Sequence, residues 1–352
     1  MDIKIFSSDR RNDWDSFVSD HKDGSIFHTM RWKRVLDKSN LGISSYMIME
    51  DKNKIVGVCP LYITNVFPFL RVFTLPSSDY ANPLLAKVSP SQIKEALSIL
   101  FSKAASMANE YKVSFWKLYL PMSSELNRFM PNRFTVEREY GSLILELDEN
   151  AERMFVGKIH KKTRTSIRKA IKMGLEVTEE LPNVNDFYDL YLSTMRRNKG
   201  FPEDITQLKV IWEELLFKKD FTVLTAKFNG KMIAVILAFL FKNKAYVWKN
   251  SSLPTCLWLN PNEFLYWKLI EQLISRGFKY LDFGPTPLNP SAGHHFFKSR
   301  FGGRMVPLCE YYVPYSKIDL SIYRNMMTMG KLLNVRKKLP DAMLTRFQKR
   351  LI

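Results

Sequence analysis

The residues best suited to chemistry are an acid, a lysine and an arginine close to residue 300. Asp282 lies near the end of an apolar strand predicted over residues 279–283. Lys298 and Arg300 follow a turn-rich segment, residues 285–295, which is predicted to form a loop. In α/β proteins, catalytic side chains often lie in loops that leave the ends of strands. We therefore predict an enzyme whose site contains these side chains.

Each of these residues has a catalytic and a structural interpretation. Lys298 precedes Gly302 and Gly303, where a ligand can approach the backbone closely, and its charge can stabilise a developing anion. Alternatively, it is a solvated lysine on a loop. Arg300 is a second candidate for the same charge, or for a phosphate clamp. Asp282 lies in so apolar a strand that free solvation is not expected; it can position a lysine, accept a proton or cap a turn.

A strongly basic segment precedes this region. Residues 158–172 hold seven Lys or Arg and no acid. A solvated helix face normally mixes acids with bases, because like charges four residues apart oppose helix formation. We therefore predict that the segment binds an anion, either phosphate or RNA, and a plain solvated face is the alternative. Helical spacing gives the segment a basic face, formed by Lys161, Arg164, Arg168 and Lys172. It also gives an apolar face, formed by Ile167 and Ile171.

Composition limits the class of protein. The 352 residues suit two domains, and a hydrophobic content of 46% supports full cores. The best candidate for a membrane span, residues 232–241, is too short and is predicted to be a buried strand. The first residues lack the apolar segment of a signal peptide, so a cytoplasmic protein is expected. A net charge of +18 implies an anionic partner.

No metal site and no tightly bound cofactor are predicted. Cys59, Cys256 and Cys309 lie far apart in the sequence. His294 and His295 are adjacent, with no cysteine or carboxylate beside them at metal-ligand spacing.

The element that must position Asp282 and Lys298 is a helix predicted over residues 261–276. Asn260 is its expected cap, Pro261 its first residue and Gly277 its stop. The helix belongs to an order of elements that occurs twice: two helices, a hairpin, a strand, a helix and a strand. The first copy covers residues 13–20, 28–38, 46–63, 69–75, 90–111 and 113–120, and the second covers residues 185–197, 205–217, 221–241, 244–250, 261–276 and 279–283.

The chain resembles the Fem-type aminoacyltransferases and their GNAT-like relatives over about residues 10–315. The resemblance implies an α/β fold of tandem GNAT-like domains, each a mixed central sheet flanked by helices. We place these at residues 1–150 and 151–315, followed by a helical tail at residues 316–352. The motifs that carry it are Lys-Lys-Thr-Arg-Thr-Ser-Ile-Arg-Lys-Ala at 161–170, Met-Gly-Leu at 173–175, Pro-Asn-Glu-Phe-Leu-Tyr-Trp at 261–267, Tyr-Leu-Asp-Phe-Gly at 280–284 and Phe-Lys-Ser-Arg-Phe-Gly-Gly at 297–303.

The resemblance also implies an activity and a set of contacts. The activity is transfer of an activated acyl or aminoacyl group to an amine. In the best-known members the donor is aminoacyl-tRNA and the acceptor is a peptidoglycan precursor. The lysine that matches Lys298 is associated in the family with the donor and the developing negative charge. The implied substrate-binding residues are Tyr80 and Asn82, in a weaker match at residues 75–84, and Lys161, Arg164, Arg168, Lys249, Asn250, Glu263 and Tyr266.

Two loops bear on the identity of the acyl donor. GNAT enzymes hold the pyrophosphate of coenzyme A with a glycine-rich loop between their fourth strand and the next helix. The corresponding loops here, residues 76–83 and 251–260, contain no glycine. This favours aminoacyl-tRNA as donor over acyl-CoA. In staphylococcal-type Fem enzymes, the tRNA contacts are ascribed to a long coiled-coil pair. In this chain, residues 159–187 leave room for only one short helix at that place.

The end of the chain is basic and amphipathic. Residues 317–352 carry nine Lys or Arg against two Asp, interleaved with apolar residues. They are predicted to form two helices broken at Pro340, which either pack on the second domain or bind an anionic membrane surface. The whole sequence thus predicts a cytoplasmic Fem-like transferase, able to lie on the inner face of the cell membrane, that forms an amide on an anionic, lipid-linked or nucleotide-linked cell-envelope precursor. The alternatives are an acyl-CoA-dependent N-acyltransferase and a non-catalytic RNA- or membrane-binding protein.

Overall fold

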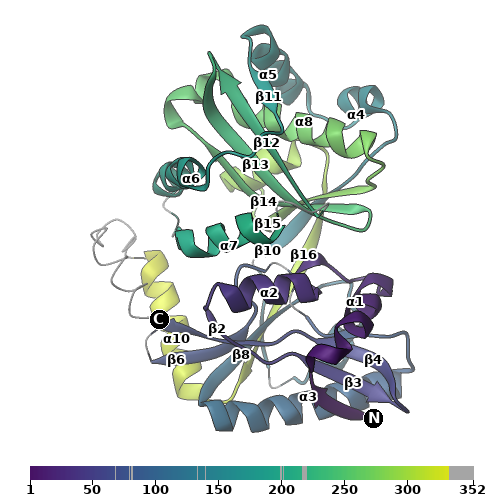
Figure 1. Ribbon diagram of the computed structural model, residues 1–352. Coiled ribbons are helices and arrows are strands. Elements are labelled where there is room, and N and C mark those ends of the chain that lie inside the picture. Colours follow the sequence, from purple (N-terminus) through teal and green to yellow (C-terminus); the bar gives the residue numbers. More distant parts are fainter. Residues whose placement is uncertain are drawn as a thin grey trace. The chain divides into compact units, whose positions relative to one another are not determined.

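The chain forms two compact units in the computed structural model (Figure 1). The structure describes residues 1–332 except residues 68, 79, 81, 133, 139, 199, 201 and 216–219. Unit 1 comprises Met1–Arg138 and Leu308–Ile352, and unit 2 comprises Glu139–Pro307. These boundaries differ from the expected ones at residues 150 and 315, because strand pairing sets them. β10 (Tyr140–Glu146) pairs with β15 (Tyr280–Pro287) of unit 2, and most of β16 (Arg304–Pro314) pairs with β8 (Val113–Pro121) of unit 1.

Unit 1 consists of two sheets and the helices that cover them. One sheet has the strand order β1-β3-β4-β7, and the other has the order β2-β5-β6-β8, continued by β16 and then by β9. β6 and β8 are parallel, and the chain joins them through α3. The elements are β1 (Asp2–Ile5), α1 (Arg11–Asp20), α2 (Met30–Lys38), β2 (Gly42–Ser44), β3 (Met47–Asp51), β4 (Lys54–Cys59), β5 (Tyr62–Phe67), β6 (Leu70–Thr74), β7 (Leu84–Leu85), α3 (Pro90–Tyr111), β8, β9 (Thr135–Glu137) and α10 (Lys317–Leu332), with short 3-10 turns at Ser8–Arg10, Ile26–His28 and Glu125–Phe129.

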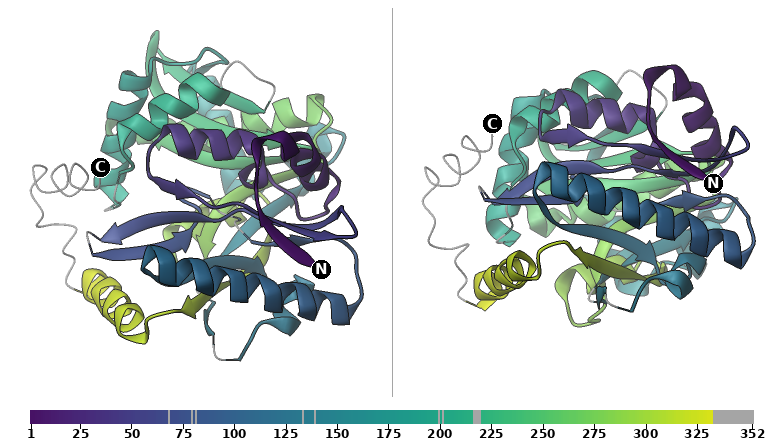
Figure 2. Two further views of the ribbon diagram at one scale, coloured as in Figure 1. Left: turned by 60° about the horizontal axis from the view of Figure 1, so that its bottom comes forward. Right: turned by 90° about the horizontal axis from the view of Figure 1, so that it is seen from below.

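Side-chain alternation along β3 and the residue before it shows how the layers of unit 1 form. Met47 and Met49 belong to the core cluster that contains Leu100 of α3. Tyr46, on the opposite face, contacts Trp14 of α1 with ring centroids 5.3 Å apart. Successive strand residues point to opposite faces, so both faces of this sheet are covered. Figure 2 shows α3 on one side of the strands and α1 with α2 on the other.

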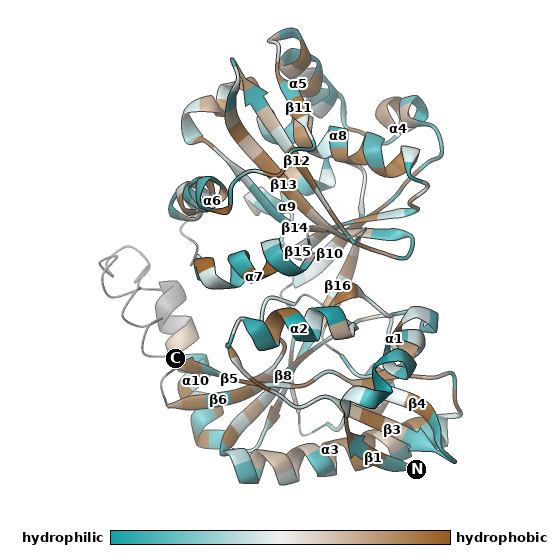
Figure 3. Cartoon of the chain, viewed as in Figure 1, coloured by the Kyte–Doolittle hydropathy of each residue, from teal (hydrophilic) through white to brown (hydrophobic). Residues whose placement is uncertain are grey.

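Unit 2 repeats this order of elements, which confirms the predicted tandem arrangement. Its sheet has the order β11-β12-β13-β14-β15-β10, and the first residues of β16 pair with β10. Figure 3 shows how apolar residues fill β12 and β13. The elements are β10, α4 (Ala151–Gly157), α5 (Lys161–Lys172), β11 (Glu176–Thr178), α6 (Val184–Asn198), α7 (Ile205–Leu215), β12 (Phe221–Phe228), β13 (Lys231–Phe241), β14 (Lys244–Ser252), the 3-10 helix η4 (Pro254–Leu259), α8 (Pro261–Ser275), β15 and α9 (Gly293–Ser299).

The parallel strands β14 and β15 pair over only part of their lengths. The last paired residues are Tyr246 and Asp282, although β14 continues to Ser252 and β15 to Pro287. The register between β13 and β14 also skips Trp248, which marks a β-bulge. Beyond Asp282, β15 therefore has backbone groups on the β14 side that are not taken up by this ladder.

The helix α8 forms where predicted, but Asn260 acts differently from the prediction. Asn260 precedes α8 in the left-handed region, with φ 56°, and its side chain makes no capping hydrogen bond. Asparagine tolerates this conformation better than most residues. At the other end, Gly277 has φ 74° and its N–H donates to Ile274 O, while Phe278 N–H donates to Leu273 O. This is a Schellman ending, and it confirms the predicted glycine stop.

Two predictions about local structure are wrong. The loop predicted at residues 285–295 is shorter, because β15 continues to Pro287 by pairing with β10, and α9 begins at Gly293. Lys298 therefore lies on a short helix. For the tail, one of the two alternatives was packing on the second domain, whereas α10 packs on unit 1, where Leu320 and Tyr323 enter a cluster with Phe115. The second predicted tail helix, after Pro340, lies outside the described residues.

Candidate functional site

The Lys298 side chain is held at the end of β15. Its ammonium donates hydrogen bonds to the carbonyl oxygens of Gly284 (3.3 Å) and Pro285 (3.0 Å) and to Thr286 Oγ1 (3.1 Å). Gly284 has φ 75°, a left-handed conformation that glycine adopts without strain, and this conformation sets the direction of its carbonyl group. The half-buried ammonium thus lies beside the part of β15 that extends past its pairing with β14.

Asp282 is fully buried and supports the same piece of backbone. Its carboxylate accepts hydrogen bonds from the Ser142 hydroxyl and from Gly284 N–H (3.0 Å). Lys244 Nζ lies 2.7 Å from Asp282 Oδ2. These partners offset the cost of burying the carboxylate. The geometry of Asp282 fits a positioning role better than contact with substrate. Asp282 holds Gly284 in place, and Gly284 in turn accepts a hydrogen bond from Lys298.

Helix α8 meets α9 through a cluster of aromatic rings. The Tyr266 ring lies 5.4 Å from those of Phe283 and Phe297 and 5.3 Å from that of Phe301. Burial raises the pKa of the Tyr266 phenol. This ring therefore packs the base of the site and fixes α9, the helix that carries Lys298, against α8.

Glu263 and Arg300 lie in the same neighbourhood. Burial raises the pKa of the Glu263 carboxyl, and the charge of Arg300 lowers it in part. The Arg300 guanidinium lies 3.9 Å from the centroid of the Phe296 ring, a cation–π contact on the exposed side of α9. The structure thus brings together five of the predicted site residues, Lys298, Asp282, Arg300, Glu263 and Tyr266.

The basic helix α5 uses its two arginines for internal contacts. Arg164 donates to the carbonyl oxygens of Phe155 and Val156 at the end of α4. The Arg168 guanidinium lies 5.2 Å from the centroid of the Phe155 ring. Arg168 is nevertheless exposed, together with Lys161, Lys162, Lys169 and Lys172, and Lys169 Nζ donates to Trp258 O at 2.9 Å. Ile171 was expected on a shared apolar face with Ile167 but is 52% exposed, because the buried face runs through Thr163, Ile167 and Ala170.

The predicted residues on β14 have protein partners. Lys249 Nζ lies 2.7 Å from Glu203 Oε1 and 4.7 Å from the centroid of the Trp248 ring. Asn250 donates its amide hydrogen to Val235 O at 3.3 Å, across the strand pair. These contacts follow the β-bulge at Trp248. They connect β14 to β13 and to the segment between α6 and α7, whereas Lys298 is held by β15.

Two polar residues that sequence reasoning missed lie next to predicted ones. Ser251 Oγ and Asn262 Oδ1 are buried and have no hydrogen-bond partner within the described part of the chain. The amide nitrogen of Asn262 donates to Ser252 Oγ at 3.1 Å, which orients the side chain and leaves its oxygen available. A buried acceptor without a partner is costly to the fold, which favours a role toward a ligand. In the sequence, only their positions point to them: Ser251 follows Asn250, and Asn262 precedes Glu263.

The connection from β14 to α8 does not form an evident phosphate-binding loop. It is occupied by η4, and Asn260 then leads directly into α8. Pro261, the first residue of that helix, has no N–H to donate. The helix start therefore offers fewer backbone donors than a glycine-rich loop would supply.

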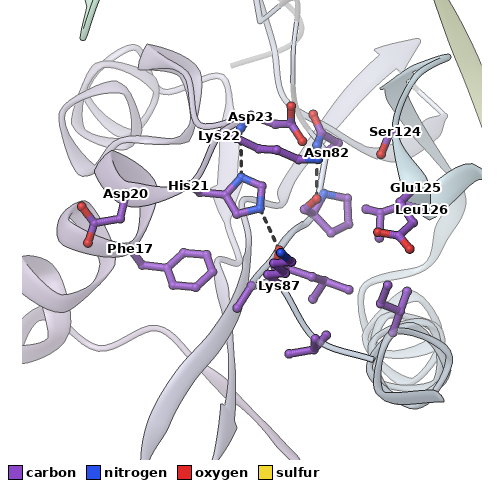
Figure 4. A pocket seen from close by; sticks show the side chains of 15 residues that line it. Phe17, Asp20, His21, Lys22, Asp23, Asn82, Lys87, Ser124, Glu125 and Leu126 are labelled. Atoms are coloured by element: carbon purple, nitrogen blue, oxygen red, sulfur yellow. Dashed lines mark hydrogen bonds between the residues drawn. The ribbon is translucent and has the colours of Figure 1, made fainter. Parts of the chain in front are cut away.

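In unit 1, Asn82 borders a cavity of about 600 Å³ (Figure 4). The His21 ring bonds to Leu85 O at 2.7 Å, and Lys22, Lys87 and Glu125 also line the space, so its wall carries both signs of charge. Asn82 O accepts a hydrogen bond from the buried His28 ring at 3.0 Å. Tyr80 is only 8% exposed and does not line this cavity. The predicted contact residues Tyr80 and Asn82 are therefore both buried, and Asn82 borders this cavity.

Comparison with known proteins gives a family domain and a fold. Residues 157–299 match the acetyltransferase (GNAT) domain family. A search of curated proteins finds no match. The crystal structure of FemX has a TM-score of 0.69 at 14% identity, covering 95% of this chain and 100% of that one.

Two further solved structures share the architecture. The C-terminal domain of a putative lysylphosphatidylglycerol synthetase from Agrobacterium fabrum has a TM-score of 0.56 at 12% identity, covering 92% of this chain and 96% of that one. A tandem GNAT protein from the clavulanic acid biosynthesis pathway has a TM-score of 0.57 at 7% identity, covering 88% and 97%. At these identities the likeness shows the fold, which confirms the predicted Fem-type, tandem GNAT-like architecture. Together with the matched GNAT domain, it supports an acyltransferase.

Proposed function

We propose that the chain transfers an aminoacyl group from aminoacyl-tRNA to an amine of an anionic cell-envelope precursor. The observation that carries this proposal is the position of Lys298, whose ammonium is fixed at the end of β15, beyond the residues that pair with β14. The amine nitrogen of the acceptor attacks the ester carbonyl of the donor. The resulting tetrahedral oxyanion then expels the ribose oxygen of the tRNA, which takes up a proton, while the amine loses one. An ammonium held in a partly desolvated site stabilises that oxyanion far better than one in bulk water does.

The hydrogen bonds of Lys298 define how this stabilisation works. An ammonium has three N–H donors, and Gly284, Pro285 and Thr286 accept from them. An oxyanion would replace Gly284 O as an acceptor, because that oxygen makes the longest of the three hydrogen bonds, at 3.3 Å. Asp282 keeps Gly284 in place during this exchange by accepting its N–H. Arg300 is the second candidate for the same charge.

The acceptor amine needs polar contacts and a proton acceptor. We assign these to the start of α8, where Asn262 Oδ1 has no partner among the described residues and the pKa of Glu263 is raised by burial. A raised pKa makes Glu263 a better match for proton transfer from an ammonium than an exposed glutamate. The other proposed substrate-binding residues are Asn250, Lys249, Tyr266, Tyr80 and Asn82. Most of them act by holding in place the elements that surround the substrate.

Two features support aminoacyl-tRNA as the donor. The β14–α8 connection lacks glycine and leads into a proline, so it is poorly suited to hold a pyrophosphate. The exposed lysines of α5 offer a surface for the phosphates of RNA or of an anionic acceptor. Lys161 and the exposed Arg168 remain in the proposed contact set, whereas Arg164 contributes by bonding α5 to the end of α4.

An acyl-CoA-dependent N-acyltransferase is the second candidate. The specific observation in its favour is that the matched domain, residues 157–299, is an acetyltransferase domain. Coenzyme A would then have to bind through backbone groups other than a glycine-rich loop.

A paired transfer assay separates the candidates. The protein is incubated with radiolabelled aminoacyl-tRNA or with radiolabelled acetyl-CoA, each with an envelope-precursor fraction, and label in ribonuclease-resistant product is counted. The expected result is transfer from aminoacyl-tRNA. Transfer from acetyl-CoA alone would establish the second candidate, and no transfer from either, with retained RNA binding, would indicate a non-catalytic protein.

A further inference from the structure

Helix α10 is anchored to unit 1 along one side. The Tyr323 ring lies 4.9 Å from the Phe115 ring of β8, and Leu320 belongs to the same buried cluster. The Asp319 carboxylate accepts a hydrogen bond from Ser114 Oγ at 2.7 Å. These contacts anchor one face of the helix, and Arg324 adds an ion pair with Glu137 at 2.7 Å.

A second apolar face of α10 is exposed. Ile318, Ile322 and Met326 occur every fourth residue, so they form one stripe along the helix. Their exposed fractions are 74%, 40% and 37%. Helices on the surface of a protein normally carry polar residues on the face opposite the core. An exposed aliphatic stripe of this length therefore marks an interaction surface.

Charge identifies the kind of partner. The part of the sequence that begins with this helix, residues 317–352, carries nine Lys or Arg against two Asp. A second copy of the chain would bring the same excess of positive charge to the stripe, in a protein with a net charge of +18, and would be repelled. An anionic lipid surface instead attracts the basic residues and offers an apolar layer to the stripe.

We propose that α10 is an interfacial helix that docks unit 1 on a bilayer containing anionic phospholipids. The stripe of Ile318, Ile322 and Met326 enters the boundary between headgroups and acyl chains, and the helix lies in the plane of the surface. Leu320 and Tyr323 stay packed on unit 1, so docking requires no unfolding. No helix of the described residues is long and apolar enough to cross a membrane, and this surface requires none. The inference concerns binding and is independent of the reaction proposed above.

Vesicle binding of the full-length protein, measured without donor or acceptor, tests the proposal. Vesicles of phosphatidylcholine alone are compared with vesicles that also contain phosphatidylglycerol. The variant Ile322→Asp places a charge in the middle of the stripe, and Ser321→Asp is the matched control, with the same added charge at the adjacent exposed position. Both sites are on the surface, so similar thermal unfolding of the two variants confirms that both are folded.

The wild-type protein and Ser321→Asp are expected to bind phosphatidylglycerol vesicles much more tightly than neutral ones. Ile322→Asp is expected to lose at least about tenfold in affinity, because an aspartate neither enters the apolar layer nor tolerates the anionic surface. Equal binding by the two variants would overturn the proposal. So would a wild-type dimer that Ile322→Asp converts to a monomer without a change in vesicle binding, since the stripe would then be a contact between copies. Failure of the transfer reaction would leave these measurements unaffected.

Discussion

Substitution of Lys298 by methionine tests the proposed chemistry most directly. Methionine keeps the length of the side chain and removes its charge, so the oxyanion loses its stabilising group while Asp282 and Gly284 stay in place. Loss of such a group costs about 10²–10³ in turnover, or about 3–4 kcal/mol of transition-state stabilisation. We expect single-turnover transfer by Lys298→Met to fall by that factor.

The structure also predicts a change in stability for this variant. The ammonium donates to three acceptors at the end of β15, all of which lose their donor. A hydrogen bond from a charged group contributes about 1.5–3 kcal/mol when it is buried. Lys298 is only half-buried and water can replace part of these contacts, so we expect a total loss of about 1–2 kcal/mol in the free energy of unfolding. The loss in transfer must therefore exceed the loss in stability.

Two controls separate charge from structure. Lys298→Arg keeps a positive charge but replaces a compact ammonium by a planar fork, so it is expected to restore stability more than transfer. Thr286→Val removes one of the three acceptors and keeps the ammonium, so its transfer is expected to fall by less than that of Lys298→Met, because only one half-buried hydrogen bond to the ammonium is lost. Near-normal transfer by a folded Lys298→Met protein would refute the assignment and leave Arg300 as the next candidate.

Three further predictions concern other parts of the chain. Lys244→Met leaves Asp282 buried without its ion-pair partner and is expected to lower the free energy of unfolding in urea by about 3 kcal/mol; an unchanged transition midpoint would mean that Ser142 and Gly284 suffice. Replacing Lys161, Lys162 and Lys172 together by alanine is expected to reduce the slope of log affinity for tRNA against log salt by about 0.7–0.9 for each phosphate that the protein no longer neutralises, whereas Arg164→Ala, which removes an internal hydrogen bond, should leave that slope unchanged. Burial lowers the pKa of His28 from 6.5 to about 4, so the unfolded state binds more protons between these values and the free energy of unfolding should fall by about 3 kcal/mol as the pH drops from 6.5 to 4; His28→Gln should remove this component, and an equally steep pH dependence in that variant would contradict it.

The sequence was most informative where local signals and core packing agree. The helix α8 carries a proline at its start and a glycine at its end, and the structure begins and ends it within a residue of the prediction. The hairpin of β12 and β13 turns at Asn229 and Gly230, both with positive φ, as an Asn-Gly pair predicts. These features depend on residues close together in the chain, which a sequence displays directly.

The site could be predicted only in part, because its contacts join distant residues. Asp282 stands out as an acid in an apolar strand, but its partner Ser142 is 140 residues away in the chain. The arginines of α5 look equivalent to its lysines in sequence. Arg164 turns toward carbonyl groups at the end of α4 and Arg168 toward the Phe155 ring, and no sequence pattern reveals either contact. The seven-residue α9 is likewise too short to be stable without the aromatic cluster against which it packs.

The basic helix and the candidate catalytic lysine are far apart in the sequence but are held by one junction. His160, just before α5, donates its N–H to Arg300 O at 2.8 Å, directly after α9. Gly302 has φ 88°, and a side chain there would lie 2.7 Å from Lys158 O, so only glycine allows this approach. An anion that bound to the lysines of α5, as proposed, would therefore lie at a defined place relative to Lys298, rather than on an independent surface. Effective acyl transfer requires such positioning, because a donor held in one orientation removes much of the entropic cost of the reaction.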